Sequence, residues 1–98
     1  MNLKIKKHFS HIKQILENSD ILIKETEKIS LFLEKRIKSK NKIFVYGNGG
    51  SFADASHFVG EMTATYSSKK RSSLPFILLG SNQSAVTGWS NDFNFNDY

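Results

Sequence analysis

The sequence contains no cysteine and a single proline among its 98 residues. The absence of cysteine excludes disulfide bonds and thiolate metal sites, and it agrees with a reducing compartment. No segment approaches the roughly 20 consecutive apolar residues that a membrane-spanning helix needs. The lysine-rich N-terminus leads into an amphipathic stretch and not into the apolar middle of a secretory signal. We therefore expect a cytoplasmic protein with no membrane partner.

Acidic residues are also few: nine Asp and Glu stand against 14 Lys and Arg, which gives a net charge of +5. Most of the basic residues precede position 43. Basic charge on amphipathic helices is compatible with contact to nucleic acid or to a membrane surface, but a solvated helix face explains it without any partner. We favour the solvated face and expect no nucleic-acid partner.

The chain divides into two parts that differ in the spacing of their apolar residues. Between residues 3 and 38, apolar residues recur at helical spacing, beginning with Ile5, Phe9 and Ile12, and the run 18–20 predicts a break between two helices. A polar joint follows at 39–42. We accordingly predict an N-terminal helical segment over 1–39 and a second domain over 40–98.

The second part alternates strand and helix patterns. We predict strands at 43–46 and 74–79, a helix from 51 to about 66, a loop at 67–73 and a short helix ending near Trp89. Ser51 and Asp54 match the Ser-x-x-acid start of a helix. This order is typical of an α/β fold with parallel strands. Two strands are few for such a sheet, so we expect part of a larger fold.

A glycine-rich turn, Gly47 to Ser51, follows the first predicted strand. Open α/β sheets bind ligands at this edge, and backbone amides at a helix start favour an anion or a hydroxylated group. The turn is not a dinucleotide fingerprint, because Phe52 stands where its last glycine should be, and it is not a P-loop. A tight strand-to-helix turn without a ligand remains the alternative.

His57 and Glu61 are four residues apart, on the predicted helix face opposite Ala55 and Val59. They are close enough to bind one metal or to act on one substrate, although such a pair is often only a solvated ion pair. A carboxylate beside an enolisable sugar carbon can move a proton between C1 and C2, which is aldose–ketose isomerisation. The pair Asn91–Asp92 could bind sugar hydroxyls or could end a helix.

The whole ordered set resembles the phosphoheptose isomerases, which are sugar-isomerase (SIS) domain proteins. The resemblance rests on Gly47 to Ser51, Asp54-Ala55, His57-Phe58 with Glu61, Leu74-Pro75, and Asn91 to Asp97. It implies a partial SIS-type, flavodoxin-like three-layer αβα fold with parallel strands, preceded by N-terminal helices. It also implies conversion of D-sedoheptulose 7-phosphate into D-glycero-D-manno-heptose 7-phosphate for lipopolysaccharide or capsule, by a zinc-containing homotetramer.

The resemblance also implies roles for individual residues. Glu61 would be the catalytic base, and His57 with Glu61 would bind Zn²⁺. The substrate-binding set would be Asn48, Gly49, Gly50, Ser51, Glu61, Asn91 and Asp92. The family's later phosphate-binding loop and its downstream glutamine and histidine have no counterpart in these residues. Trp89, Phe93 and Phe95 are expected in a core or an interface.

Three hypotheses follow. The chain is an isomerase, alone or completed by a C-terminal piece; it is a non-catalytic SIS module that binds sugar phosphate or assembles like the DnaA-associating type; or it is a remnant without function. Glu61 favours the enzyme, because the DnaA-associating type lacks that acid.

Overall fold

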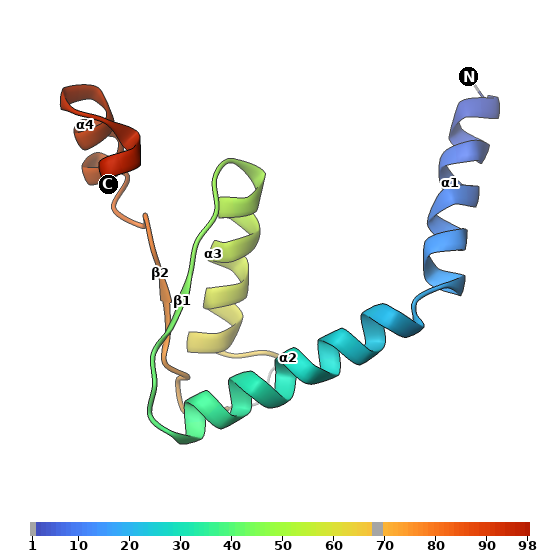
Figure 1. Ribbon diagram of the computed structural model, residues 1–98, viewed down its shortest axis with the longest axis horizontal. Coiled ribbons are helices and arrows are strands. Elements are labelled where there is room, and N and C mark those ends of the chain that lie inside the picture. The colour runs from blue at the N-terminus through green and yellow to red at the C-terminus, as the bar shows by residue number, and fades with distance from the viewer. Residues whose placement is uncertain (1, 68–69) are drawn as a thin grey trace. The chain divides into compact units, whose positions relative to one another are not determined.

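A computed structural model of the chain describes residues 2–67 and 70–98 (Figure 1). The chain divides between Lys35 and Arg36 into two compact units. This division lies close to the predicted domain boundary at 39/40, which stays a prediction. Ser68 and Lys69, in the predicted loop, lie outside the described residues. In the described ranges, no helix has the length and apolar character needed to cross a membrane.

The first unit is built from two helices, α1 (Asn2–Glu17) and α2 (Asp20–Lys38), of which α2 continues past the division. The predicted break at 18–20 is confirmed, and the Asn18 side chain donates to the carbonyl oxygen of Gln14 at 2.8 Å, which holds the end of α1. Neither helix contains a buried residue, and Phe9 is 67% exposed. The apolar stripe of α1 is therefore exposed, and that of α2 is exposed except at Leu33 and Ile37, which are half-buried.

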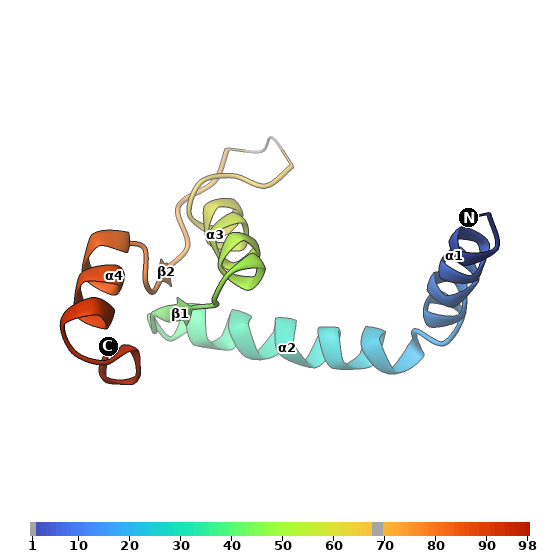
Figure 2. The ribbon, with the colours of Figure 1, turned by 90° about the horizontal axis from the view of Figure 1, so that it is seen from above.

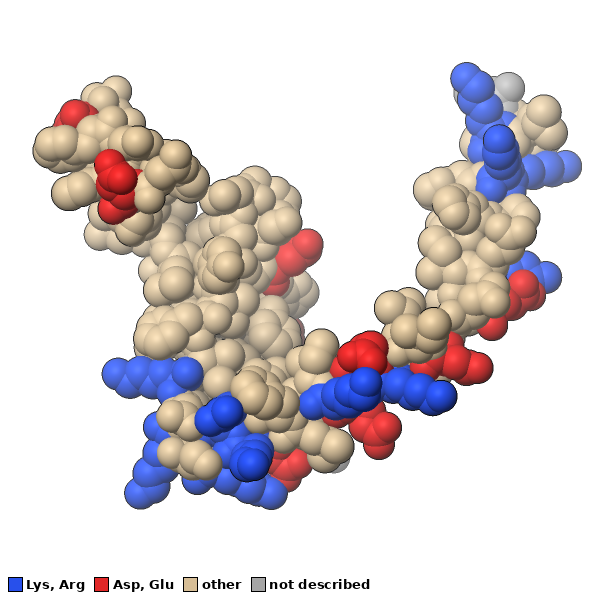
Figure 3. All heavy atoms as spheres, in the orientation of Figure 1, with Lys and Arg blue, Asp and Glu red and all other residues tan. Residues whose placement is uncertain are grey.

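Charge is unevenly distributed over the surface. Figure 3 shows Lys and Arg side chains along the helical segment and around its C-terminal end. On this segment Lys13 pairs with Glu17 at 3.6 Å and Lys28 pairs with Glu25 at 2.6 Å, and these four side chains are more than half exposed. Exposed pairs of this kind contribute about 0.3–0.5 kcal/mol each, so they support the helices without defining a site.

The second unit contains a two-stranded parallel sheet, with β1 (Ile43–Val45) paired to β2 (Phe76–Leu78). Ile43 lies opposite Phe76, and Val45 lies opposite Leu78. The ladder continues at both ends, because the Ile43 amide donates to Pro75 at 2.8 Å and the Leu79 amide donates to Val45 at 2.9 Å. The proline stands just before β2 and contributes its carbonyl group, so its missing N–H costs no ladder bond.

Helix α3 (Gly50–Thr63) connects the strands and packs on β2, and the views of Figures 1 and 2 both show it alongside the strand pair. The buried core consists of Ala55, Val59 and Phe76. The rings of Phe58 and Phe76 meet edge to face, with centroids 5.5 Å apart. The spacing of Ala55 and Val59 is one helical turn, which is why one side of α3 lies against the sheet.

The opposite face of the sheet is open. Phe44 and Ile77 are partners across the two strands, and they are 55% and 36% exposed. Beyond β2 the chain forms α4 (Gln83–Asp92) and a short 3₁₀ helix, η1 (Phe95–Asp97). The predicted α/β class with parallel strands is confirmed. Among the described residues the sheet has two strands, and α3 covers one of its faces.

Phe76 is the most buried of the core residues, so truncation of its side chain should lower the stability of the fold. Phe76→Ala is expected to lower the free energy of unfolding by about 3–4 kcal/mol, because it removes a buried ring and leaves a cavity against Phe58. Urea unfolding followed by circular dichroism measures this change. Ile77→Ala, on the open face of the same strand, should cost less than half as much, and equal losses would contradict the assignment of the core.

Gly60 offers a stabilising change within α3. An added Cβ would meet no atom within 4 Å, and the residue is exposed in a helix interior. Gly60→Ala is therefore expected to raise the free energy of unfolding by about 0.5–1 kcal/mol, since alanine loses less backbone entropy on forming helix. The same urea experiment measures it. Gly88→Ala, at a similarly open position in α4, should give a comparable gain, and a lower midpoint for Gly60→Ala would contradict the prediction.

Candidate functional site

The glycine-rich turn joins the carboxyl end of β1 to α3. The amide of Ser51 donates to the carbonyl oxygen of Asn48 at 3.1 Å, and the amide of Phe52 donates to that of Gly49 at 3.1 Å. Gly49 is the N-cap and has a positive φ of 58°, a conformation that glycine adopts without strain. The predicted cap at Ser51 with Asp54 is wrong. The helix begins at Gly50, one residue earlier, and no side chain caps it.

Gly47 has a different function in the turn. An added Cβ at this position would lie 2.6 Å from both the carbonyl carbon and the carbonyl oxygen of Ser51. Because these are backbone atoms, they cannot move away without displacing the start of α3. Gly47 thus allows the backbone of the turn to approach the first turn of the helix.

A pocket of about 760 Å³ opens at the carboxyl ends of both strands. The turn after β1 and the turn after β2 form its walls together with α4 and the C-terminal residues. Among the described residues that line it, none is Lys, Arg, His, Asp or Glu, so hydrogen bonding and aromatic contact dominate its chemistry. The lining residues are Tyr46, Gly47, Asn48, Gly49, Phe52, Leu79, Gly80, Gln83, Val86, Phe95, Asn96 and Tyr98.

The turn after β2 is held by local hydrogen bonds. Gly80 has a positive φ of 75°, and the Gln83 side chain donates to its carbonyl oxygen at 2.7 Å. Asn82 caps α4, its side-chain oxygen accepting from the amide of Ala85 at 3.1 Å. These contacts fix the wall of the pocket that faces the glycine-rich turn.

Of the predicted substrate-binding residues, Asn48 and Gly49 line this pocket. Gly50 and Ser51 lie in the first turn of α3 and are exposed. Asn91 and Asp92 are the last two residues of α4, and the side-chain amide of Asn91 donates to the Asp92 carboxylate at 3.0 Å. Neither of these two lines the pocket, so the structure does not bring them to the turn.

Sequence reasoning missed most of the pocket. Tyr46 and Leu79 directly follow the two strands, and this position at the carboxyl edge is the signal that could have identified them. Phe95 was expected in a core or an interface, whereas it is 49% exposed and lines the pocket. Trp89 and Phe93 pair with each other instead, with ring centroids 4.6 Å apart.

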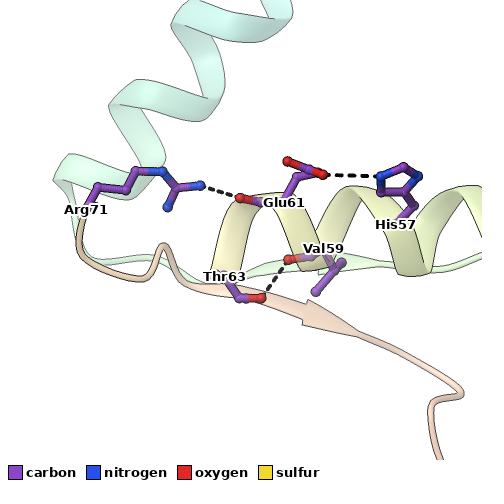
Figure 4. Close-up of polar contacts among 5 residues, drawn as sticks. All are labelled: His57, Val59, Glu61, Thr63 and Arg71. Atoms are coloured by element: carbon purple, nitrogen blue, oxygen red, sulfur yellow. Dashed lines mark hydrogen bonds and ion pairs between the residues drawn. The ribbon is translucent and has the colours of Figure 1, made fainter. Parts of the chain in front are cut away.

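His57 and Glu61 form the predicted pair on α3. Nε2 of His57 lies 3.2 Å from Oε1 of Glu61, and the side chains are 79% and 35% exposed (Figure 4). Two ligand atoms bound at about 2.1 Å to a tetrahedral zinc ion are about 3.4 Å apart, so the pair has the donor types and the spacing for two zinc positions. Within residues 2–67 and 70–98, no group of three or more such side chains could hold a metal ion. A third ligand would have to come from elsewhere.

The pair and the pocket are on opposite sides of α3. Phe52 lines the pocket, and Glu61 follows nine residues later, which at about 100° per residue is half a rotation around the helix. In Figure 4, Val59 points towards the strands, whereas His57 and Glu61 point to the other side. The chain by itself therefore presents two separate features: a pocket whose described lining contains no Lys, Arg, His, Asp or Glu, and an exposed imidazole–carboxylate pair.

Comparison with known proteins places these features in context. No family model matches the chain. Among curated proteins, phosphoheptose isomerase of Aliarcobacter butzleri is 37% identical over 91 residues, which covers 93% of this chain and 48% of that protein. Phosphoheptose isomerase of Helicobacter pylori is 37% identical over 94 residues, with 95% and 48% covered. A probable phosphoheptose isomerase of Thermoplasma acidophilum is 42% identical over 78 residues, with 80% and 40% covered.

Comparison of the structure with solved structures agrees with the sequence comparison. The solved structure of phosphoheptose isomerase GmhA from Neisseria gonorrhoeae superposes with a TM-score of 0.77 at 31% identity, over 97% of this chain and 48% of that one. The chain thus spans about half the length of the curated relatives that it matches.

Proposed function

The chain matches the N-terminal half of the phosphoheptose isomerases in sequence and in fold, and we propose that it takes part in the same reaction. The reaction converts D-sedoheptulose 7-phosphate into D-glycero-D-manno-heptose 7-phosphate, and its product would serve lipopolysaccharide or capsule synthesis in the cytoplasm. The observation that carries the proposal is the His57–Glu61 pair: these two side chains meet at 3.2 Å on a helix that begins at a glycine-rich turn.

Glu61 is proposed as the base of an enediol mechanism. Its carboxylate removes the proton from C1 of the ketose while the C2 carbonyl oxygen gains a proton. The resulting enediol then gains a proton at C2 and loses the proton on O1, so that C1 becomes the aldehyde. One oxygen of Glu61 faces His57, which leaves the second for the sugar carbon. His57 and Glu61 would hold a zinc ion, which supplies polarisation of the carbonyl when bound. The amides of Asn48 and Gly49 would orient the sugar hydroxyls.

An assembly is part of the proposal, because the pocket and the His57–Glu61 pair lie on opposite sides of α3. One sugar phosphate cannot use both in a single copy of this chain. We propose a homo-oligomer, a tetramer by resemblance, or association with a polypeptide equivalent to the other half of the relatives. The exposed apolar stripe of α1, which includes Ile5, Phe9 and Leu16, supports an interface of this kind.

Isotope exchange tests the reaction. The chain, alone and mixed with a polypeptide carrying the remaining half of the Aliarcobacter butzleri relative, is incubated with sedoheptulose 7-phosphate and zinc in D₂O. Formation of the aldose with deuterium at C2, followed by NMR, supports the proposal, since an enediol exchanges its carbon-bound proton with solvent. Absence of both aldose and deuterium exchange in every mixture would exclude it.

A non-catalytic SIS module, which binds a sugar phosphate or assembles as the DnaA-associating type does, is the second candidate. It is favoured by the pocket, which has no carboxylate or imidazole side chain among the described residues that line it and is separated from the pair. This candidate predicts saturable binding of the ester at the glycine-rich turn without exchange of any carbon-bound proton.

A further inference from the structure

The last turn of α3 is held from outside the helix by Arg71. One guanidinium nitrogen, Nη1, donates to the carbonyl oxygen of Met62 at 2.8 Å and to that of Ser72 at 3.1 Å. The other, Nη2, donates to the carbonyl oxygen of Glu61 (Figure 4). The amide of Leu74 also donates to Met62, at 3.1 Å. The chain therefore returns to the end of α3 before it enters β2.

These contacts satisfy groups that a helix leaves without partners. The last carbonyl groups of a helix have no intrahelical donors, and they form the negative end of its dipole. A guanidinium group suits this position because its planar fork can donate to two successive carbonyl groups while it carries a positive charge. Arg71 is half-buried, so water competes less with these bonds than it does at an exposed arginine.

The turn that Arg71 holds is intrinsically weak. Gly60 directly precedes Glu61, and glycine is a poor helix former because it loses the most backbone freedom. Ala64, the C-cap, has φ −100° and ψ −92°, so α3 ends at Thr63, two residues after Glu61. Without an external contact, the residues around Glu61 are expected to fray, and the Glu61 side chain would lose its fixed distance from His57.

We propose that Arg71 is a positioning residue for Glu61: by binding the carbonyl groups of Glu61 and Met62, it keeps the carboxylate within reach of His57. The proposal deepens the proposed function and rests on it, since positioning matters where Glu61 is a base or a metal ligand. Arg71 acts through the backbone, and its guanidinium group is not assigned a contact with the substrate.

The test uses the full chain and does not require turnover. Two quantities are measured by NMR: amide hydrogen exchange in the last turn of α3, and the nuclear Overhauser effect between the His57 ring and the Glu61 side chain. Arg71→Ala is expected to speed exchange at Thr63 and Ala64 roughly tenfold and to remove the Overhauser effect. Lys70→Ala, which removes the neighbouring exposed cation, should change neither.

Two further variants separate positioning from general stability. Arg71→Lys keeps the charge but not the fork, so it should restore the Overhauser effect in part. Arg71→Ala with Gly60→Ala should restore it largely, because alanine strengthens the same turn from within.

An Arg71→Ala protein that keeps the Overhauser effect and the slow exchange overturns the proposal. A complete loss of helical signal in both Arg71→Ala and the double variant Arg71→Ala with Gly60→Ala also overturns it, because Arg71 would then hold the whole unit together. These outcomes are independent of isomerase activity, so failure here is distinguishable from failure of the proposed function.

Discussion

Gly47→Ala is expected to destabilise the α/β unit by about 3 kcal/mol and to distort the wall of the pocket that Gly47 lines. The added methyl group would lie 2.6 Å from the carbonyl carbon and oxygen of Ser51 and 2.9 Å from its Cβ. All of these atoms belong to or adjoin the backbone of the first helical turn, so the clash is relieved only when the turn and α3 separate. Overpacking at a rigid site costs about 1–3 kcal/mol, and displacement of the start of α3 adds to it.

The neighbouring glycines provide matched controls. Gly50→Ala should be neutral or slightly stabilising, because an added Cβ meets no atom within 4 Å and the residue is the first of α3 and not in its interior. Gly49→Ala should cost about 1 kcal/mol, since its φ of 58° is unfavourable for alanine although space is available. Urea unfolding of the three variants gives the comparison. Equal midpoints for Gly47→Ala and Gly50→Ala would show that the close approach at Gly47 does not exist in solution.

The order of the elements could be predicted because each leaves a periodic pattern. The helical spacing of Ile5, Phe9 and Ile12 indicated α1, and two short apolar runs indicated β1 and β2. The ends were less predictable. The predicted helix from 51 to about 66 runs from Gly50 to Thr63, because its start depends on the backbone conformation of Gly49 and not on a capping side chain.

The candidate site was predicted as one feature, and the structure divides it into two. The sequence pattern already placed His57 and Glu61 opposite Ala55 and Val59, but it did not show on which side of α3 the pocket opens. That side is determined by the packing of α3 on β2 and by residues far along the chain, including Phe95 and Tyr98. Contacts between distant residues leave no local pattern, which is also why Arg71 resembled an ordinary loop cation.

Glu61→Gln is expected to reduce the isomerisation rate roughly 10²- to 10⁴-fold in the assembly that catalyses the reaction. Glutamine has the shape of glutamate and can still form a hydrogen bond with His57, so the last turn of α3 should keep its geometry. It cannot accept the proton from C1 of the ketose, and it is a weaker metal ligand. Deuterium exchange into the sugar, followed by NMR, measures the loss. Glu27→Gln on α2, a carboxylate outside the proposed site, serves as the control and should retain the full rate.

Ligand affinity should respond differently from the rate, because Glu61 and the pocket lie on opposite sides of α3. If Asn48 and Gly49 bind the sugar phosphate, Glu61→Gln should change its dissociation constant by no more than about twofold while turnover is lost. Asn48→Ala should show the reverse pattern, with weaker binding and a smaller change in the rate at saturation. A Glu61→Gln protein with full turnover would remove the carboxylate from the mechanism. Equal losses of binding in both variants would mean that the two features form one continuous site in the working assembly.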